Sequence, residues 1–77
     1  MPSGLEIKAA RVLLGLEQAE VAKAAKVDAS TLSRIEAAGT EPPGGLSRNV
    51  QAVIAVLEQR GVEFIENGVR RRPRARK

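Results

Sequence analysis

The spacing of apolar residues predicts four helices in the first sixty residues. SGLEIKAARVLLGL begins with Ser3 three residues before Glu6, a capping-box signature, and continues with apolar residues at a helical period. Gly15 then suits a helix C-terminus, because glycine readily adopts the left-handed conformation. We expect a helix at residues 4–14, a second from about residue 18, a third at 29–37 and a fourth at 46–60. GTEPPGG, between the last two, is a loop sequence.

The pattern changes to a β period near the C-terminus. VEFIENGVRRR has β-branched and aromatic residues before the turn dipeptide Asn67-Gly68, which predicts a strand at residues 62–66. A single strand needs a pairing partner. The two candidates are a return strand at residues 69–71 and the same strand of a second subunit. We favour the second subunit, because a chain of 77 residues has a small core.

The stretch AKAAKVDASTLSR decides whether residues 21–35 form one helix or two, since no Gly, Pro or Asn separates its halves. A single helix would bury the carboxylate of Asp28 and turn Val27 to solvent, which is unfavourable. A break at Lys26 and Val27 lets Val27 turn inward. It also makes Asp28 an N-cap whose carboxylate accepts backbone N–H groups, a contribution of about 1 kcal/mol. We therefore predict two helices with a short corner between them.

Composition narrows the chemistry. The chain has no Cys, His, Tyr or Trp, so the commonest nucleophiles, general bases and metal ligands are missing. We expect no enzyme, no cofactor and no metal site. No secretory signal is visible, and the apolar run at residues 53–57 is too short to span a bilayer. These observations predict a soluble cytoplasmic protein without a membrane partner.

The positive charge is concentrated at the C-terminus. Residues 70–77, RRRPRARK, carry six positive charges and no negative one, whereas residues 1–69 hold seven Lys/Arg against nine Asp/Glu. We expect this tail to be disordered by itself. If all six charges contacted DNA phosphates, deleting the tail would flatten the dependence of log K on log[salt] by up to about five units.

A short corner between two short helices is the helix-turn-helix arrangement. LGLEQAEVAKAAKVDASTLSRIE, with its spaced apolar positions, resembles the core segment of the Cro/phage-repressor-like (Xre) helix-turn-helix family, and the resemblance covers about residues 4–60. It implies a mainly α, four-helix λ-repressor-like domain, here followed by a short β-strand or hairpin. Two positions depart from the family pattern. Lys26 stands where a glycine is usual, at a strain cost of about 1 kcal/mol, and Glu17 stands where Ser, Thr or Asn usually caps the helix.

The resemblance also assigns roles to residues. It places the second helix of the motif in the major groove of DNA, with base contacts from Ala29, Ser30, Ser33 and Arg34. Arg34 is the strongest candidate, because a guanidinium can donate two bonds to guanine. It gives Gln18 a phosphate contact and a role in supporting the third helix, and it makes Arg11 and Glu36 a structural ion pair. Contacts with the DNA backbone are expected from Gln18, Thr31, Ser47, Arg48, Arg70, Arg71 and Arg72, and dimer contacts from Val62, Phe64 and Ile65.

Together these features predict a sequence-specific transcriptional regulator, a repressor that binds a palindromic operator as a homodimer and is associated with the nucleoid when bound to DNA. Residues 1–61 would be the DNA-binding domain, 62–69 a dimerisation element and 70–77 the basic tail. The main alternative is an antitoxin, or another module that binds a protein partner such as a toxin or antiactivator, on the same fold. A weaker alternative is RNA binding by the tail.

Overall fold

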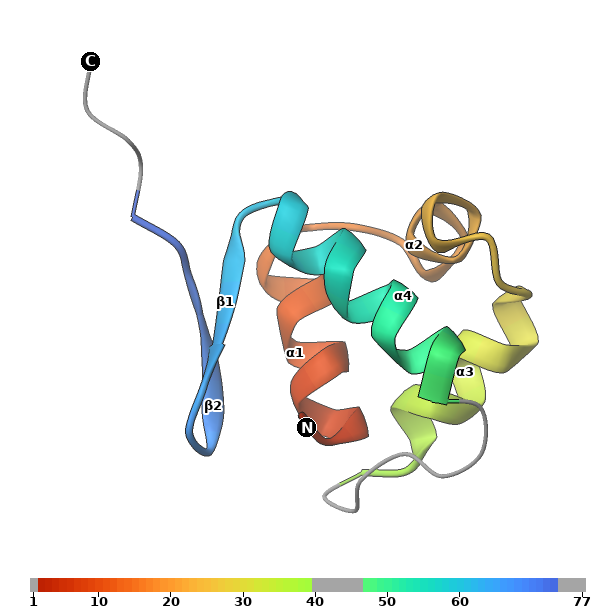
Figure 1. Ribbon diagram of the computed structural model, residues 1–77, viewed down its shortest axis with the longest axis horizontal. Coiled ribbons are helices and arrows are strands. Elements are labelled where there is room, and N and C mark those ends of the chain that lie inside the picture. The colour runs from red at the N-terminus through yellow and green to blue at the C-terminus, as the bar shows by residue number, and fades with distance from the viewer. Residues whose placement is uncertain (1, 40–46, 74–77) are drawn as a thin grey trace.

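A computed structural model describes residues 2–39 and 47–73 (Figure 1). The elements run in the order α1 (Gly4–Leu13), α2 (Gln18–Ala25), α3 (Ala29–Ala37), α4 (Ser47–Gln59), β1 (Val62–Ile65) and β2 (Gly68–Arg71). The predicted fold, mainly α with a short C-terminal β element, is confirmed. Most of the predicted loop GTEPPGG, residues 40–46, and the end of the basic tail, residues 74–77, lie outside the described residues.

Local hydrogen bonds set both ends of α1. The N–H of Glu6 donates to Oγ of Ser3 at 3.2 Å, and the N–H of Ser3 donates to Oε1 of Glu6 at 2.9 Å, so the predicted capping box is present. At the other end Gly15 has a φ of 72°. The N–H of Leu16 then donates to the carbonyl oxygen of Arg11 at 3.1 Å. Glycine therefore ends this helix in the left-handed conformation, as predicted.

The helices α2 and α3 are separate, as predicted, and the corner between them lies at Lys26 and Val27. Lys26 is left-handed, with φ 61° and ψ 43°. The N–H of Lys26 donates to the carbonyl oxygen of Lys23 at 3.2 Å. The N–H of Val27 donates to the carbonyl oxygen of Ala22 at 3.0 Å. This pair of bonds is a Schellman motif, which usually has glycine at the left-handed position. Val27 is half-buried and packs against the core.

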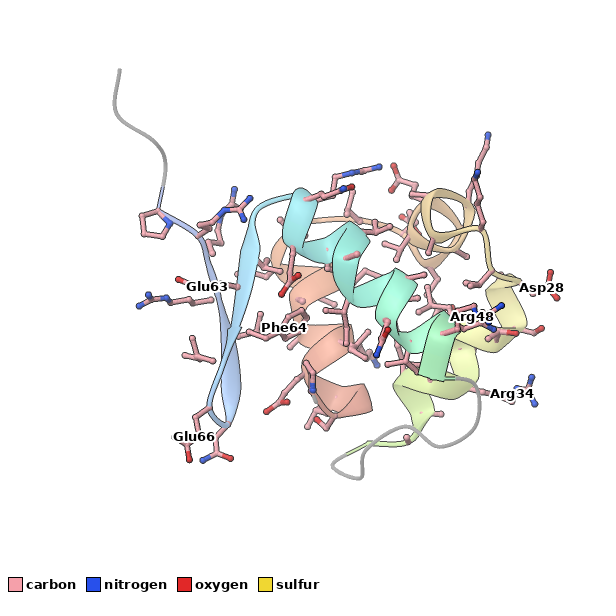
Figure 2. The ribbon with its side chains drawn as sticks, viewed as in Figure 1. Asp28, Arg34, Arg48, Glu63, Phe64 and Glu66 are labelled. Carbon is pink, nitrogen blue, oxygen red and sulfur yellow. The ribbon has the colours of Figure 1, made fainter. Side chains whose placement is uncertain are left out.

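Asp28 occupies the N-cap position of α3, with φ −69° and ψ 146°, but the predicted side-chain cap is absent. The carboxylate is exposed and points away from the helix (Figure 2). The backbone carbonyl of Asp28 begins the helix instead, by accepting the N–H of Leu32 at 3.1 Å. An exposed carboxylate is already solvated, so a capping bond exchanges one partner for another and gains little.

The four helices enclose a single apolar core. α4 crosses α1 and packs on α2, and the hairpin covers the far side of α1 (Figure 1). The largest fully buried side chains of this core are Ile7, Val21, Leu32, Val50, Val53, Leu57 and Val62. The N-terminus of α1 lies so close to the end of α3 that a Cβ on Gly4 would overlap the carbonyl oxygen of Ile35. This close contact and the core fix the position of α3.

β1 pairs with β2 of the same chain in an antiparallel hairpin, with Phe64 opposite Val69. The preference for a second subunit as the pairing partner of β1 was therefore wrong, and the return strand is its partner. Asn67 lies in the turn with a φ of 61°, which asparagine tolerates better than most residues. Val62 is fully buried in the chain's own core. Intrachain pairing wins because a two-residue turn brings the strands together at a small cost in entropy.

Candidate nucleic-acid interface

The helix α3 presents a polar face to solvent. Its apolar side chains Leu32 and Ile35 are 0% and 6% exposed and anchor it to the core. The helical period then places the intervening residues on the outer side. Thr31 is half-buried. All four predicted base-contacting residues are exposed on this side: Ala29, Ser30, Ser33 and Arg34.

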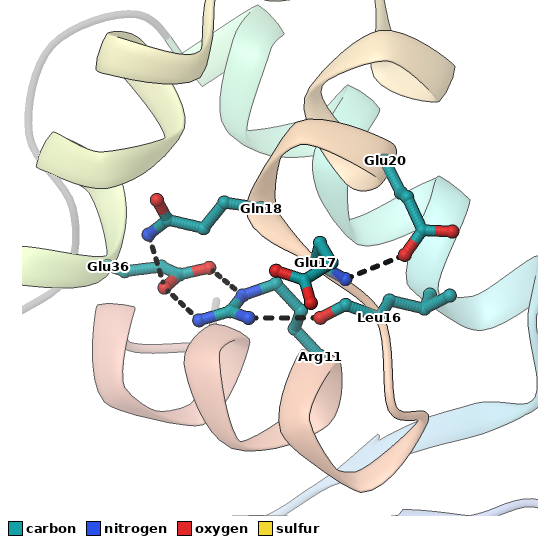
Figure 3. A network of polar contacts seen from close by, with 6 residues as sticks. All are labelled: Arg11, Leu16, Glu17, Gln18, Glu20 and Glu36. Atoms are coloured by element: carbon teal, nitrogen blue, oxygen red, sulfur yellow. Dashed lines mark hydrogen bonds and ion pairs between the residues drawn. The ribbon is translucent and has the colours of Figure 1, made fainter.

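A buried polar network attaches α3 to α1 and α2 (Figure 3). Arg11 donates from Nε to Oε2 of Glu36 at 2.7 Å and from a terminal nitrogen to Oε1 at 3.0 Å. The amide nitrogen of Gln18 donates to the same Oε1 at 3.0 Å. A further guanidinium nitrogen of Arg11 donates to the carbonyl oxygen of Leu16 at 3.0 Å. The predicted ion pair is thus present, and Gln18 supports α3 through Glu36.

Arg11 and Glu36 form a largely buried ion pair. The side chains of Arg11 and Glu36 are only 14% and 4% exposed. The hydrogen bond that Arg11 donates to Glu36 raises the pKa of Arg11. Burial lowers this pKa, and the charges of Glu36 and Glu17 add to the increase. The pKa of Arg11 is thus raised from an already high value, so its guanidinium stays charged throughout the usual working pH range. Glu36 is therefore a structural anchor for α3.

The N-terminus of α2 shows how Glu17 serves in the usual capping position. Its backbone N–H donates to Oε1 of Glu20 at 2.8 Å, so the acid three residues later caps the first turn (Figure 3). The helix therefore begins at Gln18 without the Ser, Thr or Asn that the family usually has there.

Arg48 extends from the first turn of α4 at the same end of the molecule as Arg34 (Figure 2). Its side chain is exposed, and Ser47 is the first residue of the helix. Arg34, a predicted base contact, and Arg48, a predicted contact with the DNA backbone, therefore lie at the same end of the molecule's long axis.

The hairpin lies at the opposite end of the molecule (Figure 1). Arg70, Arg71 and Arg72 are exposed there. Arg70 pairs with Glu63 across the hairpin at 2.7 Å, and a terminal nitrogen of Arg71 lies 3.4 Å from the carbonyl oxygen of Leu13. The fold therefore does not bring these three arginines to the exposed face of α3. Their predicted contact with the DNA backbone remains a prediction.

The residues predicted to form a dimer differ in their environments. Val62 belongs to the core, and Phe64 is half-buried and packs against it, pointing toward α1 (Figure 2). Ile65 is 46% exposed. Only Ile65 among the three offers an extensive apolar surface to a partner.

The sequence did not single out Lys8, which the structure places beside the predicted interface. Lys8 of α1 lies with Gln18, Ser33, Glu36 and Ala37 around a hollow. Its position on the exposed side of an amphipathic helix is the ordinary place for a lysine. No local sequence signal marks its proximity to α3, because that depends on how the two helices pack.

Within residues 2–39 and 47–73, no group of three or more His, Cys, Asp or Glu side chains is arranged to hold a metal ion. Nor does that part of the chain include a helix of the length and apolarity needed to cross a membrane.

A short helix, a tight corner and a second helix with an exposed polar face define a helix-turn-helix domain of the DNA-binding type. Comparison with protein families agrees: residues 7–50 match the helix-turn-helix family of the Cro/C1 type, and the chain belongs to that family. The match runs from α1 into the first turn of α4, so the hairpin lies outside it. A comparison with curated proteins gave no match.

Proposed function

We propose that the protein is a sequence-specific transcriptional regulator, a repressor that binds a palindromic operator as a dimer. The observation that supports this proposal best is the outer face of α3: four short or cationic side chains are exposed on a helix that the core and the Glu36 network hold in place. A rigid, exposed polar helix can enter the major groove without first being ordered.

Arg34 is the main base-contacting residue in this proposal. Its guanidinium is exposed and matches O6 and N7 of guanine, a contact worth about 1–3 kcal/mol of discrimination. Ala29 touches a thymine methyl group. The hydroxyl groups of Ser30 and Ser33 donate to or accept from base edges, or donate to adjacent phosphates.

Contacts with the DNA backbone position α3 in the groove. The amide nitrogen of Gln18 has one hydrogen on Glu36, which leaves the second for a phosphate. Arg48 supplies a positive charge at the same end of the molecule as Arg34, and Thr31 of α3 supplies a hydroxyl. These contacts contribute affinity independently of the base sequence.

In the dimer the subunits meet through the hairpin. The exposed Ile65 supports this arrangement, and the hairpin end is remote from α3, so that pairing leaves both recognition faces free (Figure 1). A twofold dimer then reads two half-sites about one helical turn apart.

The test begins with selection of binding sites from a randomised DNA duplex library. Wild-type protein is expected to enrich one palindromic motif, and Arg34→Ala to lose about 5- to 150-fold in affinity for it while keeping its affinity for unrelated DNA. Arg60→Ala is the matched control, since it removes one exposed arginine charge outside α3, directly after the C-terminal end of α4. Enrichment of no motif by the wild type, or equal losses in the two variants, would contradict the proposal. Analytical sedimentation with and without DNA measures the mass of the assembly. The wild type is expected to be a dimer, and Ile65→Asp is expected to weaken it.

A further inference from the structure

A hollow of about 190 Å³ lies where three helices meet beside the recognition face. Its lining consists of Lys8 from α1, Gln18 from α2, and Ser33, Glu36 and Ala37 from α3. The hollow is open to solvent and mostly polar. Because Ser33 lines the hollow and is also one of the predicted base-contacting residues, the hollow adjoins the exposed face of α3.

The charge of the hollow is set by Lys8. Glu36 is the other charged residue in the lining, but both of its carboxylate oxygens accept hydrogen bonds, from Arg11 and Gln18. Arg11 neutralises it at 2.7 Å. Neither of the two ion pairs among the described residues includes Lys8. The ammonium group is thus the net charge of this site, and it attracts an anion.

The position of the hollow indicates which anion. When α3 lies in a major groove, the two sugar–phosphate backbones form the walls of the groove on either side of it. The hollow flanks α3 on the side of α1 and shares Gln18, the residue expected to contact a phosphate. A backbone on this side of α3 is therefore next to the hollow that Lys8 lines.

We propose that Lys8 binds a DNA backbone phosphate seated over this hollow, next to the phosphate that Gln18 contacts. This inference rests on the proposed function, and it adds α1 to the DNA interface. Lysine suits the role because its ammonium is a compact charge on a flexible stem and binds phosphate as a point charge. A contact of this kind adds affinity for any duplex and no sequence preference.

The experiment measures the dissociation constant against salt concentration for Lys8→Ala on two duplexes, the selected motif and an unrelated sequence. Loss of one phosphate contact is expected to reduce the slope of log K against log[salt] by about 0.9 on both. The wild type then loses about three-fold more affinity than the variant between 50 and 200 mM salt. The ratio of specific to non-specific affinity stays unchanged, unlike that of Arg34→Ala.

Lys23→Ala is the matched control. Lys23 is an exposed helical lysine on α2 that does not line the hollow, so its removal changes the net charge equally. Its slope is expected to match the wild type, and Lys8→Arg is expected to restore the slope. Equal slopes for Lys8→Ala and the wild type, or equal reductions for Lys8→Ala and Lys23→Ala, would overturn the proposal for Lys8 alone. Absence of DNA binding by the wild type would instead overturn the proposed function.

Discussion

Replacement of Lys26 by glycine is expected to stabilise the protein. Lys26 is the left-handed residue of the corner between α2 and α3, with a φ of 61°. Gly15 occupies the equivalent place at the end of α1, where the same two hydrogen bonds close the helix. The geometry of the corner is therefore one that glycine adopts without change. The Lys26 side chain is exposed, so its removal costs no core packing.

The magnitude follows from two opposing effects. A Cβ in the left-handed region costs about 1–2 kcal/mol, which glycine removes. Glycine in turn loses more conformational entropy on folding, about 0.5–1 kcal/mol relative to alanine. The net gain is about 0.5–1 kcal/mol. Since about 1 kcal/mol shifts the Tm of a domain of this size by about 4–8 °C, the expected increase is about 2–8 °C.

Thermal and urea unfolding of three proteins measure this effect: the wild type, Lys26→Gly and Lys26→Ala. The alanine variant is the control, because it removes the same charge and stem but keeps the Cβ. Lys26→Gly is expected to be the most stable of the three. A glycine variant with a Tm equal to or below that of the alanine variant would show that the Cβ is not strained, and would refute the left-handed corner.

Three other substitutions test particular contacts by urea unfolding. Gly4→Ala places a methyl group against the carbonyl oxygen of Ile35 and is expected to lose about 1–3 kcal/mol; unchanged stability would contradict the close packing of α1 on α3. Arg11→Met leaves the buried carboxylate of Glu36 without its cation and is expected to lose about 3–5 kcal/mol, most of it regained with Glu36→Met added. Equal losses in the single and double variants would count against the pair. Asp28→Ala is expected to lose less than about 0.5 kcal/mol, since its carboxylate makes no capping bond; a loss near 1 kcal/mol would show that it caps α3 in solution.

Local chemistry explains why the helices could be predicted so closely. The capping box of Ser3 and Glu6, the left-handed Gly15 and the corner at Lys26 each depend on residues fewer than six positions apart. A single helix would bury the carboxylate of Asp28 and expose Val27, whereas two helices let Val27 turn inward. This comparison was enough to separate α2 from α3. Local reasoning failed at Asp28, where a side-chain cap and hydration have nearly equal free energy and the residue type alone does not choose between them.

The network around Glu36 depends on another kind of information. Arg11 and Glu36 are 25 residues apart, and no spacing rule connects them. Their pairing was expected from the resemblance to the family, and the participation of Gln18 as donor to the same oxygen emerged only when three helices had been packed together. The sequence pattern likewise did not identify the partner of β1, because a return strand and a second subunit could each satisfy the backbone hydrogen bonds at an edge of this strand.

The sequence by itself determined the approximate bounds of the helices, the capping box that begins α1 and the corner that separates α2 from α3. Hydrogen bonds within a turn or two and the apolar period determine all of these, and both are written in neighbouring residues. Tertiary structure alone decided that the hairpin pairs within the chain, that Val62 joins the core, and that Lys8 lies beside Ser33 of α3. These depend on contacts between residues distant in sequence, which exist only once the core has brought the elements together.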